Sequence, residues 1–276
     1  MSITAQEVNK LRTMTGAGMM DCKKALTESS GDFEKAIDIL RKKGQKVSAS
    51  RTDKQASEGA VFVKTNAAKN EGIVIALNCE TDFVAKTDDF IKLGTTILET
   101  AVTKKPATVE ELENAPAEGR TIKDLMTDLM GKIGERLEIS AYEVVKGEVV
   151  VPYIHSNSKL GVLVALKNAA GTDVAEAGKD VAMQIAAMKP IALDKDGIDI
   201  KIIEREIEIG KEQARVEGKP EAMLEKIAMG KLNKFYKDST LLNQEFVKDN
   251  SKTIAQMLDG IKKGLTVSDF KRVAIG

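Results

Sequence analysis

The sequence of 276 residues has no tryptophan, one histidine and two cysteines, and only 4% of its residues are aromatic. The single histidine, His155, excludes any site that needs two imidazoles. Cys22 and Cys79 lie in unrelated contexts without paired or metal-type spacing, so we expect both to be reduced, packed thiols. Because methionines number eleven, adaptable aliphatic packing is expected to dominate the core.

Net charge and long apolar runs are also lacking. Forty-two basic residues balance 42 acidic ones, so no overall positive field exists to hold a polyanion, and direct nucleic-acid binding is disfavoured. The first 55 residues, locally basic, leave room only for a small patch. No apolar run approaches the roughly 20 residues that cross a bilayer, and no signal-like segment opens the chain. The sequence predicts a cytoplasmic protein with no membrane partner.

The common catalytic and nucleotide-binding motifs are absent. The chain contains no G-x-x-x-x-G-K-[ST], no H-E-x-x-H and no G-x-S-x-G. Gly16-Ala17-Gly18 imitates the start of a dinucleotide fingerprint, but a predicted helix precedes it and Asp21 replaces the third glycine. We therefore expect a protein that is not an enzyme and that has no cofactor or metal site.

Helix signals dominate the N-terminal part of the chain. Thr4 and Glu7 form a capping-box pattern before a first short helix, a second is predicted over 19–28, and Asp32 is placed to cap a third. These helices would form a compact three-helix module. The polar segment 43–57 shows no sustained apolar period and is predicted to be a linker.

After this segment the sequence repeats itself. Two β-rich runs around a polar turn, 59–63 and 72–77, resemble the runs 147–151 and 161–166. Each pair has the signature of a β-hairpin and is followed by a helical pattern. We predict an α+β protein with two repeat-related core subdomains, in which helices cover one face of each antiparallel sheet.

The predicted helices that follow the hairpins cover 90–102 in the first copy and 174–188 in the second. Near the end of the chain, Ser251 is predicted to cap a helix, and the run 265–275 is predicted to return as a strand to the second sheet.

A different pattern occupies 198–236. Apolar residues recur three and four apart, and a break at Gly218 and Pro220 divides the segment in two. The interpretations are a pair of ordinary core helices or a projecting antiparallel helical hairpin, and the dense Glu and Lys on the other faces favour projection.

From these patterns we predict three units. Residues 1–55 form the three-helix module and linker, 56–145 form core subdomain 1, and 146–276 form core subdomain 2. The helical hairpin, over about 194–240, belongs to the last unit.

The segment Thr81–Val84 follows the first hairpin and has two interpretations. In one, it is a helix start in which Thr81 is the N-cap, Asp82 favours the positive helix end, and Phe83 and Val84 turn into the core. In the other, Phe83 is an exposed ring that wedges between side chains of a partner, while Asp82 perturbs an ion or phosphate site there. The second copy has Thr172-Asp173-Val174 at this place, without a phenyl ring.

Met19 and Met20 also allow two interpretations. Adjacent helical positions lie about 100° apart, so at least one methionine is free to be an exposed, deformable contact, although core packing explains the pair equally well. His155 is placed in the turn of the second hairpin, where a surface histidine needs no special function.

Three stretches resemble the bacterial elongation factor Ts family. They are Leu11-Arg12-x-x-Thr15-Gly16-Ala17-Gly18-Met19-Met20-Asp21-Cys22-Lys23-Lys24-Ala25-Leu26, then Asn78-Cys79-Glu80-Thr81-Asp82-Phe83-Val84-Ala85, then Lys132-Ile133-Gly134-Glu135. The similarity continues through Tyr153, His155 and 161–164 to 251–253. It covers nearly the whole chain in the family's order.

The resemblance implies a guanine-nucleotide exchange factor for elongation factor Tu, a GTPase of protein synthesis. Arg12, Met19 and Met20 match positions that contact the GTPase's nucleotide domain, and His155 matches a contact on another of its domains. Asp82 and Phe83, within Thr81–Val84, match the pair whose entry disturbs the Mg²⁺ and phosphate site. The factor itself would bind neither nucleotide nor metal.

One departure concerns the end of the chain. Some family members carry a further C-terminal helical module, whereas this sequence ends at Gly276 after its last strand-like run. Contacts from such a module are expected to be absent. Two other functions compete with exchange: a passive scaffold that binds through the three-helix module, and an RNA-binding accessory protein that uses the basic N-terminal stretch.

Overall fold

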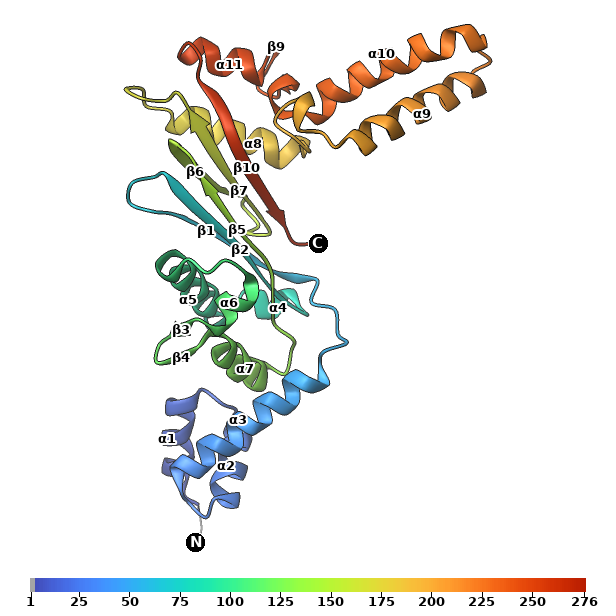
Figure 1. Ribbon diagram of the computed structural model, residues 1–276. Helices are drawn as coiled ribbons and strands as arrows, with labels where there is room; N and C mark the ends of the chain where they lie inside the picture. The colour runs from blue at the N-terminus through green and yellow to red at the C-terminus, as the bar shows by residue number, and fades with distance from the viewer. Residues whose placement is uncertain (1–2) are drawn as a thin grey trace.

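Two small antiparallel sheets, with helices on their outer sides, form the centre of the computed structural model, which describes residues 3–276 (Figure 1). The helices are α1 (Ala5–Thr15), α2 (Met19–Glu28), α3 (Phe33–Ser50), α4 (Asp82–Ala85), α5 (Asp88–Lys104), α6 (Val109–Asn114), α7 (Ile122–Ile133), α8 (Ala175–Met188), α9 (Ile200–Val216), α10 (Glu221–Ser239) and α11 (Ile254–Ile261). The strands are β1 (Glu58–Thr65), β2 (Glu71–Cys79), β3 (Pro116–Ala117), β4 (Arg120–Thr121), β5 (Glu138–Lys146), β6 (Val149–Ile154), β7 (Leu160–Lys167), β8 (Glu245–Phe246), β9 (Asp249–Thr253) and β10 (Thr266–Ala274). The predicted α+β class is confirmed.

The two three-stranded sheets pack face to face. One has the strand order β1-β2-β5 and the other β10-β7-β6. Aliphatic side chains from both sheets, among them Val74 and Leu163, form a cluster between them. Because the outer face of the first sheet is covered by α5 and α7, strand β2 is buried along its whole length. Helices α8 and α11 cover the second sheet in the same way, so the core has four layers.

The repeat predicted from the sequence is present and extends further than the sequence indicated. In both sheets the second strand of the hairpin, β2 or β7, pairs on its other side with a later strand, β5 or β10. Each of these later strands has a register shift at a serine, Ser140 in β5 and Ser268 in β10. The prediction that 265–275 returns to the second sheet is confirmed. Strand β5 was not predicted.

The predicted alignment of the first strands of the two hairpins is wrong by one residue. Because the two turns have the same length, Gly59 corresponds to Glu148 and not to Gly147. The glycines serve different packing roles. A Cβ on Gly59 would lie 2.2 Å from the carbonyl oxygen of Leu77, whereas one on Gly147 would lie 2.7 Å from the Cβ of Ala165. Sequence similarity therefore paired two glycines that are not equivalent.

The two hairpins also bond to each other reciprocally. The Val61 N–H of β1 donates to the Ser158 carbonyl at the β6–β7 turn over 2.7 Å, and the Val150 N–H of β6 donates to the Lys69 carbonyl at the β1–β2 turn over 2.6 Å. Lys69 and Ser158 both have positive φ, 54° and 56°. Each turn is thus held against the opposite sheet, which fixes the position of the exposed residues in the turn.

The N-terminal helices form the predicted module with its own apolar cluster, and the capping box of Thr4 and the cap of Asp32 are confirmed. The predicted linker over 43–57 is wrong for its first half, because α3 continues to Ser50. Its last turns cross α7, where Gly44 lies against the Thr127 carbonyl and Gly131. Close backbone packing replaces apolar side chains there, which explains why no apolar period was visible.

Helices α9 and α10 form the projecting hairpin that the charge pattern favoured (Figure 1). Gly210 of α9 packs against Ala228 of α10, and Gly218, at φ 72°, makes the turn. Two other details differ from expectation. The cap of α11 is Thr253 and not Ser251, which lies in β9. The predicted helix over 174–188 begins one residue later, at Ala175, whose N–H donates to the Asp173 carboxylate over 3.0 Å. No helix within residues 3–276 is long and apolar enough to span a membrane.

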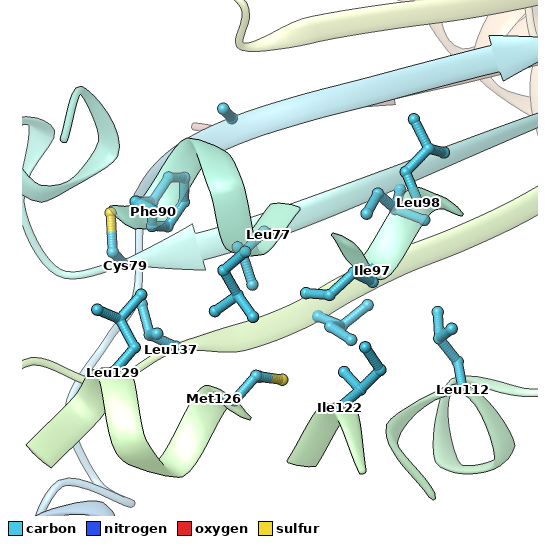
Figure 2. Packing of buried hydrophobic residues seen from close by; sticks show 14 of the residues in the cluster. Leu77, Cys79, Phe90, Ile97, Leu98, Leu112, Ile122, Met126, Leu129 and Leu137 are labelled. Atoms are coloured by element: carbon cyan, nitrogen blue, oxygen red, sulfur yellow. The ribbon is translucent and has the colours of Figure 1, made fainter. Parts of the chain in front are cut away.

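Both cysteines are free and buried, as expected. Cys79 lies beside Phe90 in the core under the first sheet (Figure 2). Burial, with smaller effects from Glu135 and Glu58, raises the pKa of the Cys79 thiol to about 12.

We predict that neither thiol reacts with a water-soluble disulfide reagent at neutral pH in the folded protein. Burial blocks access to both, and the raised pKa also keeps the Cys79 thiolate scarce. Each protein thiolate that attacks the reagent forms a mixed disulfide and releases one reagent thiolate, so counting the released thiolate before and after adding guanidinium chloride tests this. Two thiols should react after unfolding, and a rapid reaction of either one in the native protein would contradict it.

Candidate functional site

The segment from Thr81 to Ala85 is a single helical turn at the end of β2. Thr81 has an extended backbone, with φ −123° and ψ 152°, and its side chain accepts a hydrogen bond from the Val84 N–H over 3.4 Å. The predicted N-cap is therefore present. Ala85 is buried and Val84 is half-buried against the core. Phe83, in contrast, is 80% exposed, so the interpretation that places its ring in the core is wrong.

Two carboxylates hold the backbone that leads into α4. Glu135, just after the left-handed Gly134 that ends α7, accepts the N–H groups of Glu80 and Thr81 over 3.1 and 3.0 Å. It also accepts the Thr81 hydroxyl over 2.7 Å. The Glu80 carboxylate accepts the Arg136 N–H over 2.8 Å and pairs with Arg51 at 2.9 Å. We call Glu80, Thr81, Glu135 and Arg136 the carboxylate clamp.

Asp82 faces solvent beside Lys86, four residues later in sequence. The Lys86 Nζ lies 2.7 Å from the Asp82 Oδ2. This hydrogen bond, with weaker help from the charges of Lys86 and Lys159, holds the pKa of Asp82 below its ordinary value. The same contact raises the pKa of Lys86. Asp82 is therefore ionised at neutral pH, and its exposed ion pair is weak enough to be exchanged for another partner.

His155 lies at the same end of the paired sheets as α4. It is exposed in the β6–β7 turn, and its Nδ1 is 2.9 Å from the Tyr153 hydroxyl oxygen. The neighbouring Lys159 forms an ion pair at 2.5 Å with Glu58, at the start of β1. Glu58 pairs across the sheet with Cys79, the last residue before the carboxylate clamp. The structure thus brings the β6–β7 turn and Thr81–Val84 to the same end of the paired sheets.

Arg12, Met19 and Met20 lie on a different part of the molecule, where α1 ends and α2 begins. Arg12 is exposed, and Met19 and Met20 are 52% and 75% exposed, so the core interpretation of the methionines is wrong. Met14 on α1 is exposed as well, at 57%. Deformable methionines on a surface are typical of contacts with a partner.

The module that carries these residues is attached to the core through the crossing of α3 and α7. Figure 1 shows α1, α2 and α3 beyond α7, on the side away from the second sheet. Lys132 of α7 pairs with Asp89 at the start of α5. The same side chain lies against Gly16 of the module, because a Cβ added to Gly16 would be 3.1 Å from the Lys132 Nζ. One packed scaffold therefore carries two separate candidate surfaces. One lies on the module and the other at the end of the paired sheets where α4 begins.

Sequence reasoning missed the carboxylate clamp. Glu80 and Glu135 both fall in stretches that carried the family resemblance, but spacing alone could not show that residues 55 positions apart bond to each other.

Within residues 3–276 there is no cluster of three or more potential metal-ligating side chains. What the arrangement offers is an exposed ring and a carboxylate on a fixed support.

Comparison with known proteins identifies related sequences. The family described as elongation factor TS matches residues 80–276. A protein named elongation factor Ts from Cytophaga hutchinsonii is 68% identical over 275 residues, which cover 99% of both chains. Its namesakes from Amoebophilus asiaticus and Chlorobium phaeobacteroides are 57% and 40% identical, the first over 100% and the second over 99% of both chains.

Proposed function

The chain belongs to the elongation factor Ts family, and from that premise we propose that it is the guanine-nucleotide exchange factor for elongation factor Tu. Its role is in the elongation phase of protein synthesis. The finer part of the proposal is the mechanism: the chain promotes GDP release by disturbing the Mg²⁺ and phosphate site of the GTPase. It acts by binding and performs no covalent chemistry.

The observation that carries this mechanism is the exposure of Phe83. A phenyl ring that is 80% exposed on a four-residue helix contributes little to the fold. Aromatic side chains of this kind are enriched among the residues that dominate binding energy at interfaces. Phe83 is therefore placed to enter a partner while its backbone stays on the core.

Asp82 supplies the electrostatic part. Its carboxylate, ionised at neutral pH and paired with an exposed lysine, is free to compete for polar groups that surround a bound Mg²⁺. Losing the metal leaves the β-phosphate charge of GDP poorly compensated, so GDP leaves faster. Thr81 and Val84 support the pair, the first as the cap and the second as the contact with the core.

The other candidate residues provide binding energy at a distance. Arg12, Met19 and Met20 contact the nucleotide domain of the GTPase, and His155 contacts a second domain. Two contacts on one packed scaffold hold the GTPase in the vacant conformation. We propose a division of function in which 1–55 is the contacting module, 56–145 carries the intruding pair and 146–276 carries His155. The factor acts in the cytoplasm, without nucleic acid or a bound nucleotide of its own.

Exchange by this route requires that GDP and the factor weaken each other's binding. We expect the affinity for nucleotide-free elongation factor Tu to exceed that for its GDP·Mg²⁺ form by at least about fivefold, the lower end of typical coupling between sites. Titration calorimetry of both forms, and of GDP binding with and without the factor, measures the same ratio twice. Equal affinity for the two forms would instead indicate a passive scaffold.

A further inference from the structure

We propose that Glu135 is a positioning residue for exchange, which acts by holding Thr81 and the backbone before α4 so that Phe83 points outward in a fixed direction. This inference rests on the proposed function and adds a residue to it. Glu135 lies on the turn after α7, at 55 positions from Glu80.

The first argument is that one carboxylate satisfies three donors. Glu135 accepts from the Glu80 N–H, the Thr81 N–H and the Thr81 hydroxyl, at 3.1, 3.0 and 2.7 Å. Hydrogen bonds to a charged acceptor are stronger than neutral ones. These donors are part-buried where the chain leaves β2, so losing the acceptor would leave them without a protein partner.

The second argument concerns the cap of α4. The Thr81 hydroxyl has to accept from the Val84 N–H, and its donation to Glu135 fixes the rotamer that makes this possible. A helix of four residues has no stability of its own, since one turn is close to the costly nucleus of a helix. Its direction therefore depends on the cap and on the contacts of Val84 and Ala85 below it.

The third argument is that the support is reciprocal. Glu135 binds the backbone of the Glu80 turn, and Glu80 binds the backbone N–H of Arg136, next to Glu135. The Arg136 guanidinium in turn donates to the carbonyls of Thr52 and Lys54 at 2.6 and 2.8 Å. The carboxylate clamp joins three segments that are distant in sequence, which restricts the motion of each.

The second copy of the repeat provides an internal comparison. At the corresponding end of β7, the exposed Glu148 binds the N–H groups of Asn168 and Ala170. The strand pairing places Ala170, which has no hydroxyl, at the position of Thr81, so the alignment of Thr172 with Thr81 predicted from the sequence is wrong. The following helix starts only at Ala175, where the Asp173 carboxylate accepts the Ala175 N–H over 3.0 Å, and its N-cap residue, Val174, has no hydroxyl. The hydroxyl-mediated support occurs in the copy that carries the exposed phenyl ring.

The test is GDP release from elongation factor Tu, measured over a range of factor concentrations with Glu135→Ala, Glu135→Gln, Phe83→Ala and the double variant Phe83→Ala/Glu135→Ala. We expect Glu135→Ala to lower the maximal rate about fivefold, since a loosened ring loses part of its orientation. Glu135→Gln should keep most of the rate, because its carbonyl can accept the two N–H groups and its amide can donate to the Thr81 hydroxyl.

The double variant separates positioning from general damage. If Glu135 acts through Phe83, the double variant releases GDP no more slowly than Phe83→Ala alone, whereas independent effects would multiply. Amide hydrogen exchange gives a second readout: Glu135→Ala should speed exchange at Thr81 and Val84 while α7 stays protected. If Glu135→Ala does not fold, Thr81→Val replaces it in the same cycle.

The outcomes distinguish the two proposals. Wild-type release by Phe83→Ala would overturn the proposed mechanism, whatever Glu135 does. Slow release by Phe83→Ala together with wild-type release by Glu135→Ala would overturn the positioning role alone. Multiplying effects in the double variant, or a Glu135→Gln variant as slow as Glu135→Ala, would also overturn it.

Discussion

Replacing Phe83 with alanine is expected to lower the GDP-release rate at a fixed factor concentration by roughly thirtyfold or more, the effect of losing an interface residue worth about 2 kcal/mol. The physical reason is that the ring supplies the wedge, and no other aromatic side chain lies on α4. Because Phe83 is 80% exposed, its removal should change the free energy of unfolding by less than about 0.5 kcal/mol. Stopped-flow release of a fluorescent GDP analogue and thermal unfolding measure the two quantities.

The matched control is Ile261→Ala, which removes an apolar side chain, 46% exposed, from α11 on the other side of the second sheet. It should leave the release rate unchanged. Asp82→Ala is expected to have a smaller effect than Phe83→Ala, since it removes the carboxylate but leaves the wedge. Normal rates with both the Phe83 and the Asp82 variants would eliminate the mechanism.

Replacing Gly44 with valine is expected to detach the N-terminal module from α7. A Cβ at this position would lie 2.8 Å from the Thr127 carbonyl oxygen, which belongs to a helix backbone and cannot turn away. Overpacking of this kind costs about 1–3 kcal/mol. When the module is free to rotate, the module and Phe83 are no longer held in the relative orientation that lets both contact the GTPase at once. The affinity for the GTPase should therefore fall roughly tenfold.

Small-angle scattering and hydrogen exchange along α7 measure the detachment, and calorimetry measures the affinity. The matched control is Gly230→Ala in α10, where a Cβ would meet no atom within 4 Å. In a helix this substitution should stabilise by roughly 0.5–1 kcal/mol and leave the affinity unchanged. A Gly44→Val protein with the scattering profile and affinity of the unaltered chain would show that the crossing does not position the module.

Local signals in the sequence predicted much of the secondary structure correctly. Thr4, Asp32 and Thr81 cap helices as predicted, because a cap depends on a side chain and the backbone two or three residues away. The hairpins β1–β2 and β6–β7 were visible for the same reason, since their alternation and turns are local. The absence of catalytic motifs and the balanced charge also favoured a binding protein over an enzyme or a nucleic-acid-binding protein.

Predictions failed where a contact between distant segments decides the outcome. Helix α3 extends past Gly44 because α7 lies against it, and a glycine at such a crossing looks like a linker residue in the sequence. Strand β5 pairs with β2, which is distant in sequence, and the register shift at Ser140 interrupts its alternation. Gly59 and Gly147 were matched by identity although strand pairing makes them inequivalent.

For the candidate site, the sequence by itself determined which residue types stand after β2 and that Thr81 starts a helix there. It left the direction of Phe83 undecided, because one helical turn can place an apolar ring either toward the core or toward water. Only the tertiary structure decided this: Val84 and Ala85 occupy the inward positions, and Glu135, brought in from the end of α7, holds the cap. A cap is set by neighbours in the chain, whereas the side that is left exposed is set by what packs beneath it.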